Sequence, residues 1–234
     1  MDRYNWDILV ALGAVTLSDR WTAYSGQTCG CERETNGNNN ASKVCCEMKL
    51  QTFHIAGPIG MQPLRRGDAR GYFAETFRAD LFEEAVGDIA FVQENESLSA
   101  KMGTIRGLHF QTDPFAQGKL VRCIAGALLD VTVDIRTGSP TYGQWLAVEL
   151  SAENGQQLWV PPGFAHGFCT LQSDTMLAYK VTAYYDQASD KGLAWNDSAI
   201  GIAWPAVADP DTLSPKDCVQ PRLADLPAYF TYEG

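Results

Sequence analysis

The chain has 234 residues, of which 45% are hydrophobic and 20% are charged, so it is too apolar for a disordered chain and typical of a folded one. Its formal net charge of −10 argues against a protein that grips nucleic-acid backbones, which needs a basic face, but leaves room for a small basic pocket. The longest apolar run, 8–17, is shorter than the ~20 residues that a membrane-spanning helix needs.

Residues 1–47 differ in composition from the rest of the chain. After one short apolar patch, residues 26–42 are dominated by Gly, Asn, Thr and Cys, which is typical of irregular chain. The four cysteines at 29, 31, 45 and 46 have the spacing of neither a disulfide framework nor a zinc site, so we expect free thiols and a reducing, cytoplasmic compartment. We expect 1–47 to be an extension, poorly ordered or a start-site artefact, and 48–234 to be the functional domain.

From residue 48 onward the apolar residues recur with a period of two, which predicts strands. The clearest case is 129–135, where apolar residues alternate with Asp130, Thr132 and Asp134, as in a half-buried strand. Asn154-Gly155 is the strongest hairpin signal. Further strands are expected at 120–124, 145–150, 157–160, 167–171 and 176–185, and helices only at 79–86 and near the C-terminus. Many short strands at this spacing predict an all-β sandwich or barrel.

Two of the three histidines lie in this strand-rich part. His166 ends the pattern Gly155-x5-Pro161-x-Gly163-x2-His166, which resembles the second motif of the cupin superfamily. In metal-binding cupins the first motif begins His-x-His, whereas this chain has His109-Phe-Gln111, and two lone histidines do not complete a metal shell. The resemblance implies a cupin-type double-stranded β-helix, that is, a jelly-roll barrel, with a few short helices and no metal.

A more specific resemblance rests on eight motifs that follow one another along the chain. They are Asp68-Ala-Arg70-Gly71-Tyr-Phe73-Ala-Glu75, Phe91-Val-Gln93-Glu-Asn95, Arg106-Gly-Leu-His109-Phe-Gln111, Gln117-Gly-Lys119-Leu-Val121, Asp134-Ile-Arg136-x-Gly-Ser139-Pro-Thr141, Pro162-Gly-Phe-Ala-His166-Gly-Phe168, Tyr179-Lys180-x5-Tyr185 and Leu213-Ser214-x2-Asp217. Together they resemble the dTDP-4-dehydrorhamnose 3,5-epimerase family over residues 48–217.

The resemblance implies a cofactor-independent isomerase that inverts C3 and C5 of dTDP-4-dehydro-6-deoxy-D-glucose, giving dTDP-4-dehydro-L-rhamnose for dTDP-L-rhamnose biosynthesis. Both carbons are α to the C4 ketone, so each inversion needs a base, an acid on the opposite face and a positive group for the enolate oxygen. By resemblance, His109 is the base with Asp217 as its carboxylate partner. Tyr179 is the acid, and Lys119 stabilises the enolate.

The resemblance also assigns a set of residues to substrate binding. An arginine can grip phosphate oxygens with two hydrogen bonds, and an aromatic ring can stack on thymine. In the family, part of this set reaches across a dimer interface, which implies a homodimer whose sites are completed by the partner subunit, with neither nucleic acid nor membrane as a partner. The residues are Arg70, Phe73, Glu75, Gln93, Asn95, Arg106, Asp130, His166 and Tyr185.

Simpler explanations exist for individual residues, and the motif context decides against them. His109 alone would be a hydrogen-bonded strand histidine, and Asp217, in a loop after Ser214, would be a solvated charge. Three hypotheses therefore stand: the 3,5-epimerase; a related 3-epimerase or ketoisomerase acting on a dTDP-4-keto sugar; and a non-catalytic cupin that binds a nucleotide sugar or a partner protein. The complete acid–base set favours the first.

Overall fold

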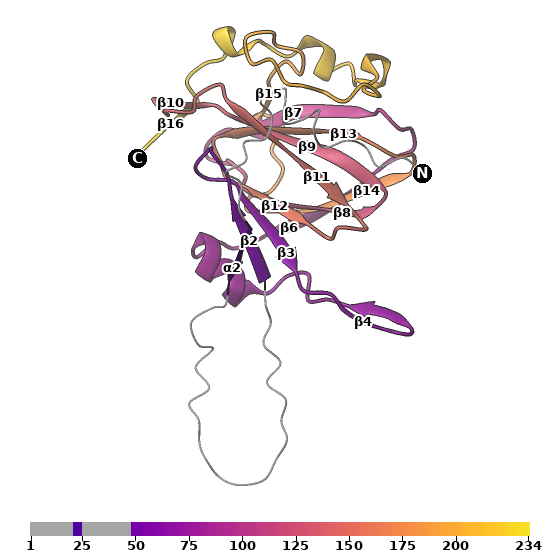
Figure 1. Cartoon of the computed structure of the whole chain (residues 1–234). Coiled ribbons are helices and arrows are strands. Elements are labelled where there is room, and N and C mark those ends of the chain that lie inside the picture. Colours follow the sequence, from indigo (N-terminus) through magenta and orange to yellow (C-terminus); the bar gives the residue numbers. More distant parts are fainter. Residues whose placement is uncertain (1–20, 25–47) are drawn as a thin grey trace.

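Two antiparallel sheets face each other and enclose the interior of the protein (Figure 1). The computed structural model describes residues 21–24, by their backbone alone, and residues 48–234. The larger sheet has the order β1 (Trp21–Tyr24), β2 (Met48–Thr52), β3 (Ile59–Pro63), β12 (Gln157–Val160), β8 (Lys119–Ala125), β14 (Thr175–Val181), β6 (Gln93–Ser99). The smaller has the order β11 (Trp145–Ser151), β9 (Ala127–Asp134), β13 (Phe164–Thr170), β7 (Ile105–Gln111), β15 (Asp190–Gly192).

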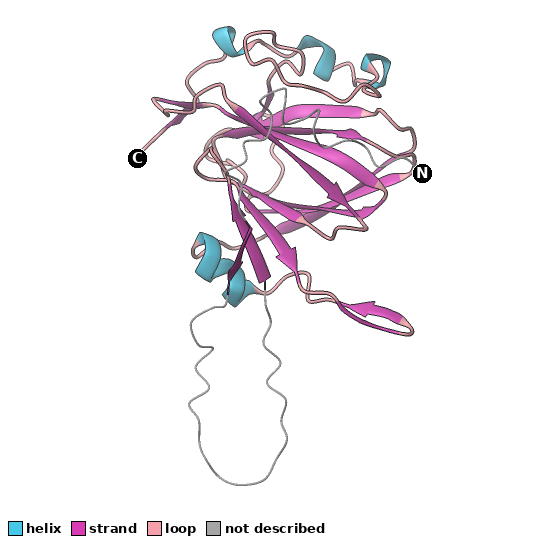
Figure 2. Cartoon of the chain, in the orientation of Figure 1, coloured by secondary structure: helices cyan, strands magenta, loops and turns pink. Residues whose placement is uncertain are grey.

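The remaining elements lie outside these two sheets (Figure 2). Strands β4 (Arg66–Asp68) and β5 (Gly71–Phe73) form a hairpin that projects from the barrel, and we call residues 66–73 the arm. Strands β10 (Arg136–Thr137) and β16 (Phe230–Thr231) pair in parallel. The helical elements are α2 (Ala79–Val86) and the 3-10 turns η1 (Pro210–Thr212), η2 (Asp217–Val219) and η3 (Leu223–Asp225).

Successive strands alternate between the two sheets. From β6 to β9 each strand lies in the sheet opposite to its predecessor, and the same is true from β11 to β14. This winding is that of a jelly roll, and it confirms the predicted all-β barrel with a few short helices. It also brings β7 and β14, which carry different parts of the predicted site, to face each other across the interior.

Three apolar clusters hold the layers together. The first fills one part of the space between the sheets, with Val121, Leu128, Leu158 and Phe168 among its buried members. The second lies on the outer face of the smaller sheet, where the C-terminal segment covers it. The third lies on the outer face of the larger sheet, beneath α2. The central strands β9, β12 and β13 are therefore buried almost throughout, whereas β6, at the edge of the larger sheet, alternates between half-buried and exposed residues.

The predicted helix at 79–86 is confirmed with the same bounds. Its side chain Phe82 is 2% exposed and lies edge-on to Trp159, with ring centroids 5.2 Å apart. The helix ends where Gly87 adopts a φ of +122° and its N–H bonds to the carbonyl of Glu83. The helix expected near the C-terminus is replaced by the three 3-10 turns, because Pro210, Pro221 and Pro227 divide that segment into short pieces.

The prediction of a half-buried strand at 129–135 is wrong. Asp130, Thr132 and Asp134 are all 0% exposed. Two causes combine: the apolar face, with Val131 and Val133, packs under the C-terminal segment, and the polar face points into the barrel, where the two carboxylates have partners. Alternation correctly indicates a strand with two different faces, but it does not tell which one meets solvent.

The Asn154-Gly155 pair is not a hairpin. It joins β11 of the smaller sheet to β12 of the larger one, and these strands do not pair. The Asn154 Oδ1 accepts the N–H groups of Ser151 and Gln156, and Gly155 has a φ of +65°. Asn154 and Gly155 do form a tight turn, as such residues commonly do, but this turn connects two strands of different sheets and not two paired strands.

The predicted extension, 1–47, and its four cysteines lie outside the described residues, apart from Trp21–Tyr24, whose backbone pairs with β2. Within the described residues Cys123 and Cys169 are buried, Cys218 is exposed, and all three are free thiols. No helix in that part of the chain has the length and apolar character needed to cross a membrane.

A buried ion pair fastens one end of the barrel. The carboxylate of Asp134 accepts hydrogen bonds from Arg136 at 2.9 and 2.7 Å, from Ser139 at 2.6 Å and from Thr141 at 2.7 Å. The Arg136 guanidinium also lies over the ring of Tyr232, near the C-terminus. Burial raises the pKa of Asp134, but these hydrogen bonds outweigh it and hold the pKa below its ordinary value.

We expect Arg136→Met to lower the free energy of unfolding by about 3–5 kcal/mol, because it leaves a buried carboxylate without its cation. Urea denaturation at several pH values measures this. Since the folded pKa of Asp134 is lowered, its stabilisation is complete well above the ordinary value of 3.8 and is lost as the pH falls below it. Lys180→Met, which removes a partly exposed pair with Glu94, is the control and should leave the urea midpoint nearly unchanged. Equal midpoints for the two variants would contradict the prediction.

Candidate active site

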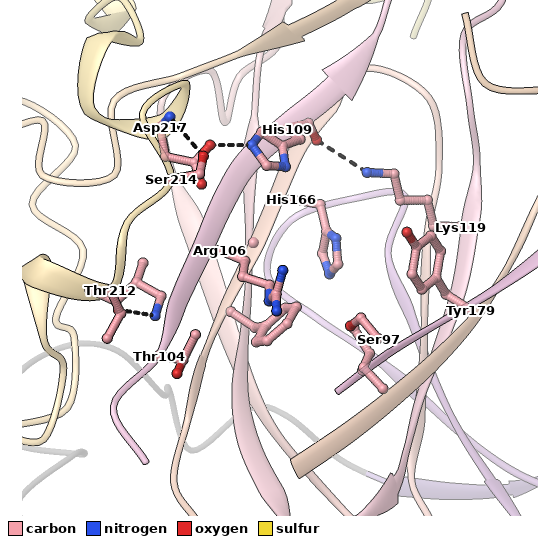
Figure 3. Close-up of a pocket in the computed structure, with 14 residues that line it drawn as sticks. Ser97, Thr104, Arg106, His109, Lys119, His166, Tyr179, Thr212, Ser214 and Asp217 are labelled. Atoms are coloured by element: carbon pink, nitrogen blue, oxygen red, sulfur yellow. Dashed lines mark hydrogen bonds and ion pairs between the residues drawn. The ribbon is translucent and has the colours of Figure 1, made fainter. Parts of the chain in front are cut away.

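A cavity of about 330 Å³ opens between the two sheets (Figure 3). A second cavity, of about 340 Å³, adjoins it, and His109, Lys119 and Tyr179 line both. We call the first the inner cavity and the second the outer cavity. All four predicted catalytic residues line the inner cavity, although they come from β7, β8, β14 and η2.

His109 stands on β7 with a carboxylate behind it. Its Nε2 lies 2.5 Å from Oδ1 of Asp217, which is 4% exposed. Burial raises the pKa of Asp217, but hydrogen bonds from His109, the Ser214 hydroxyl and the backbone N–H of Gly107 outweigh it and lower the pKa. The carboxylate therefore stays ionised and fixes the ring orientation of His109. Asp217 is therefore not a solvent-exposed loop residue, because the C-terminal segment packs against β7 and places the carboxylate next to His109.

A second histidine–carboxylate pair lies beside the first. His166 on β13 is the cross-strand neighbour of His109, and its Nε2 is 2.9 Å from both carboxylate oxygens of Asp130 on β9. Asp130 is fully buried and His166 is 7% exposed. The smaller sheet therefore presents two imidazoles to the inner cavity, each held by its own carboxylate. No group of three or more His, Cys, Asp or Glu that could hold a metal ion occurs among the described residues.

Lys119 comes from the opposite sheet and reaches toward His109. Its Nζ donates a hydrogen bond to the backbone carbonyl of His109 at 3.3 Å. Loss of hydration lowers the pKa of the ammonium to about 8, although the charges of Asp130 and Asp190 oppose this. Near neutral pH the group is thus mostly protonated and poorly hydrated, a state in which a positive charge acts strongly on a nearby oxyanion.

Tyr179 faces His109 across the inner cavity, from β14 of the larger sheet (Figure 3). Burial raises the pKa of its phenol, against the opposing effects of the Arg106 charge and a hydrogen bond with Asn95. The phenol therefore keeps its proton through the neutral range. A base on one sheet and a proton donor on the other, with an ammonium beside both, can remove a proton from one face of a small molecule and deliver one to the other face.

Six of the nine predicted binding residues lie in or next to the two cavities. Arg106 lines the inner cavity, where its Nε and Nη2 donate to the Ser99 hydroxyl and the Leu98 carbonyl. Gln93, Asn95 and Tyr185 line the outer cavity. With His166 they surround the two cavities, while Asp130 lies behind His166.

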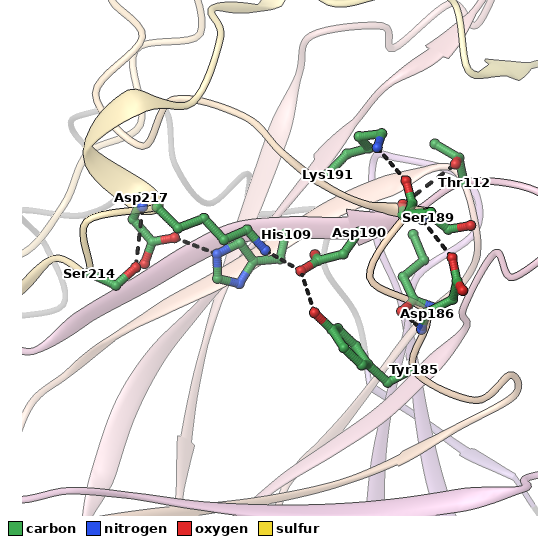
Figure 4. A network of polar contacts seen from close by, with 12 residues as sticks. His109, Thr112, Tyr185, Asp186, Ser189, Asp190, Lys191, Ser214 and Asp217 are labelled. Carbon is green, nitrogen blue, oxygen red and sulfur yellow. Dashed lines mark hydrogen bonds and ion pairs between the residues drawn. The ribbon is translucent and has the colours of Figure 1, made fainter.

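The structure adds two charged residues that the sequence did not single out. Asp190 and Lys216 line the outer cavity and form an ion pair, and Asp190 also accepts a hydrogen bond from the hydroxyl of Tyr185 at 3.2 Å (Figure 4). For Lys216 a signal existed, since it precedes Asp217 directly. For Asp190 there was none, because only the fold brings β15 beside the loop that bears Tyr185.

Three predicted binding residues lie apart from both cavities of their own chain. Arg70 and Phe73 are on the arm and Glu75 follows it, and none of them lines either cavity. The Arg70 guanidinium pairs with Asp68, and Phe73 is 69% exposed. Within one chain, therefore, the arm does not join the site that the other predicted residues form.

The chain matches known proteins along most of its length. A family model described as dTDP-4-dehydrorhamnose 3,5-epimerase matches residues 52–225. The enzyme of that name from Sinorhizobium fredii is 58% identical over 186 residues, 80% of this chain and 95% of its own. Two similar crystal structures are the dTDP-6-deoxy-D-glucose-3,5-epimerase of Legionella pneumophila with dTDP-4-keto-L-rhamnose (42% identity, TM-score 0.75, 80% of this chain and 100% of that one) and the dTDP-4-dehydrorhamnose 3,5-epimerase of Bacillus anthracis with TDP and PPi (46%, 0.72, 75% and 99%).

Proposed function

The chain belongs to the dTDP-4-dehydrorhamnose 3,5-epimerase family, and we propose that it converts dTDP-4-dehydro-6-deoxy-D-glucose into dTDP-4-dehydro-L-rhamnose. One observation carries the proposal. A carboxylate-backed imidazole, His109, and a protonated phenol, Tyr179, face each other from opposing sheets across one cavity. Inverting a carbon needs a base and an acid on its two faces, and this arrangement supplies both.

In the proposed reaction His109 removes the proton from C3 or C5. Each of these carbons is α to the C4 ketone, so the electron pair of the broken C–H bond moves into the ring and forms an enolate. Its oxygen becomes negative, and the ammonium of Lys119 stabilises that charge. The buried carboxylate of Asp217 stabilises the imidazolium that forms on His109.

Tyr179 then gives its proton to the same carbon from the opposite face. A new C–H bond forms, the enolate returns to the ketone and the configuration is inverted. The raised pKa of Tyr179 suits this step, because the phenol retains its proton until a strongly basic carbanion or enolate faces it. His166, held by Asp130, completes the wall of the cavity beside the sugar.

The outer cavity receives the nucleotide in this proposal. Tyr185 supplies a ring for the thymine to stack on, and Gln93 and Asn95 supply amide groups for its polar edge. Arg106 lies where it can bind the diphosphate, whose charge requires a cation. The net charge of −10 is no obstacle, since a few local cations suffice for one diphosphate.

We further propose that the protein acts as a homodimer in which the arm enters the partner subunit's site. The arm projects from its own barrel and exposes Tyr72 and Phe73, at 61% and 69%, beside Arg70. Exposed aromatic side chains next to an arginine are typical of a protein interface. In such a dimer Arg70, Phe73 and Glu75 would reach a substrate site, that of the partner subunit, with the barrel in its present conformation.

The decisive experiment incubates the enzyme with dTDP-4-dehydro-6-deoxy-D-glucose in deuterated water and locates the solvent deuterium by NMR. We expect deuterium at both C3 and C5, because each inversion replaces a carbon-bound proton. Deuterium at C3 alone would identify a 3-epimerase, the alternative within the same chemistry. No deuterium at either carbon would contradict catalysis on this substrate and leave a binding protein.

Mixing two defective variants tests the arm. Arg70→Ala and His109→Ala homodimers should each be nearly inactive. In a heterodimer of the two, one site unites an intact His109 with an intact Arg70 from the other chain. Random exchange of subunits should therefore restore about a quarter of the wild-type activity, since half of the dimers are mixed and each has one intact site. No recovery after subunit exchange, verified by tagging one variant, would mean that the arm does not complete the partner's site.

A further inference from the structure

Three glutamine side chains form hydrogen bonds with the backbone of one short segment, residues 183–186. This segment follows β14 and carries Tyr185, the aromatic ring of the outer cavity. The glutamines are Gln93 on β6, Gln111 on β7 and Gln117 in the loop before β8, so they come from three separate parts of the chain. We call Gln111 and Gln117 the glutamine clamp, because Gln93 is already proposed to bind the nucleotide.

Gln111 makes the most contacts. Its Nε2 donates to the carbonyl of Tyr184 at 3.1 Å and to that of Phe115 at 2.7 Å, and its Oε1 accepts the N–H of Asp186 at 2.9 Å. The side chain is 4% exposed, so water does not compete for these bonds. It thereby bonds the backbone on both sides of Tyr185 and ties it to the loop at 112–118. This is also the position where metal-binding cupins have their second histidine, a feature that the proposed reaction does not use.

Gln117 and Gln93 hold the same segment from two other directions. The Nε2 of Gln117 donates to the carbonyl of Ala183 at 2.7 Å, and the Oε1 of Gln93 accepts the N–H of Tyr185 at 3.2 Å. Four consecutive residues, 183–186, thus each give one backbone group to a glutamine amide. These bonds fix the backbone of an irregular segment that has no strand or helix to hold it.

The side chain of Tyr185 has little else to fix it. Residue 185 is 60% exposed, and the only hydrogen bond of its hydroxyl among the described residues goes to Asp190. Asp190 depends on the same segment, because its N–H bonds to the carbonyl of Asp186. The position of the ring is therefore determined by the backbone that the clamp holds. Figure 4 shows the contact between Tyr185 and Asp190.

We propose that Gln111 and Gln117 are positioning residues that preorganise Tyr185, and with it Asp190, for binding the nucleotide. This rests on the proposed function, since it assigns the outer cavity to the thymidine end of the substrate. A ring held in its bound position before the ligand arrives costs less ordering on binding. Gln111 needs to be an amide, because it donates two hydrogen bonds and accepts one, which neither a carboxylate nor an apolar side chain can do.

The test is a double-mutant cycle on dTDP affinity. Gln111→Leu and Gln117→Leu are each made in the wild type and in Tyr185→Ala, and dTDP binding is measured by calorimetry. We expect either clamp variant to weaken binding about 10-fold in the wild type and less than about 2-fold in Tyr185→Ala, because residues that act through one partner are not additive. In steady-state assays the KM for the dTDP-sugar should rise while kcat stays within about 2-fold.

Two controls separate this role from a general effect on folding. Gln62→Leu removes a glutamine that donates to the backbone carbonyl of Asn154 and lines neither cavity, so it should change neither KM nor kcat. Thermal melts verify that each variant is folded, and Gln117, which is only half-buried, serves if Gln111→Leu does not fold.

Equal losses with and without the Tyr185 ring, or a fall in kcat at unchanged KM, would overturn the clamp proposal while leaving the proposed function intact. Failure of the wild type itself to bind dTDP would instead refute the proposed function, and the role of the clamp with it.

Discussion

Replacing His109 by alanine is expected to lower the rate of deuterium incorporation at C3 and C5 by about 10³-fold while dTDP binds almost as before. His109 is the imidazole that faces the inner cavity with a buried carboxylate behind it. Its loss removes the base, whereas the ring and amides proposed to hold the nucleotide lie in the outer cavity. NMR measures the exchange, and calorimetry measures dTDP affinity.

The matched control for this variant is His54→Ala. His54 is exposed and lines neither the inner nor the outer cavity, so its removal should change neither rate nor affinity. Asp217→Asn is informative beside it, because it keeps the shape of the pair but removes the charge that stabilises the imidazolium. Exchange at the wild-type rate in His109→Ala would show that the base is another group.

Tyr179→Phe should separate exchange from inversion. Without the phenol, His109 can still remove a proton, trade it with the solvent and return deuterium to the face it came from. We therefore expect deuterium to enter the substrate with its configuration unchanged, while formation of the inverted product falls by roughly 10²–10⁴-fold. NMR of the recovered sugar distinguishes the two outcomes, because inversion changes the coupling between ring protons.

Tyr184→Phe is the control here. The side chain of Tyr184 is 63% exposed and lines neither cavity, so the variant loses a phenol that the proposed reaction does not use. It should invert both carbons at the wild-type rate. If Tyr179→Phe also forms the inverted product at an undiminished rate, the proton on the second face comes from elsewhere, with water the first candidate.

Several strands and the helix α2 were predictable because they depend on local patterns, although β13 begins three residues before its predicted start at 167 and β14 ends four residues before its predicted end at 185. Period-two alternation located β8, β11 and β12 to within one residue at either end, and α2 has its predicted bounds. The pairing of strands was not predictable in the same way. Asn154-Gly155 indicates a reversal of the chain, but which sheet the next strand joins depends on residues far away in the sequence.

The faces of β9 illustrate the same limit. Asp130, Thr132 and Asp134 look like a solvent-facing row, yet all are fully buried. What buries them is the rest of the protein: the C-terminal segment takes the apolar face, and His166 and Arg136 neutralise the carboxylates inside. A sequence shows that two faces differ, while only the tertiary structure decides which of them meets water.

The residues of the site differ in how far the sequence could predict them. Motif resemblance placed His109, Lys119, Tyr179 and Asp217 in one cavity, although up to 108 positions separate the members of a pair. It could not show that the arm lies outside the cavities of its own chain, since that is a property of an assembly. Asp190 was missed because a single aspartate at the start of a three-residue strand has no distinguishing pattern.

The position of Asp217 on the segment that covers the smaller sheet has a consequence for how the enzyme is made. A ribosome delivers His109 and the other barrel residues well before it delivers Asp217, and the segment has to dock on the completed sheet to bring the carboxylate to the imidazole. A chain that ends before residue 217 therefore lacks the carboxylate partner of His109 together with part of the apolar cover of the smaller sheet. Completion of the base and completion of the core depend on the same segment.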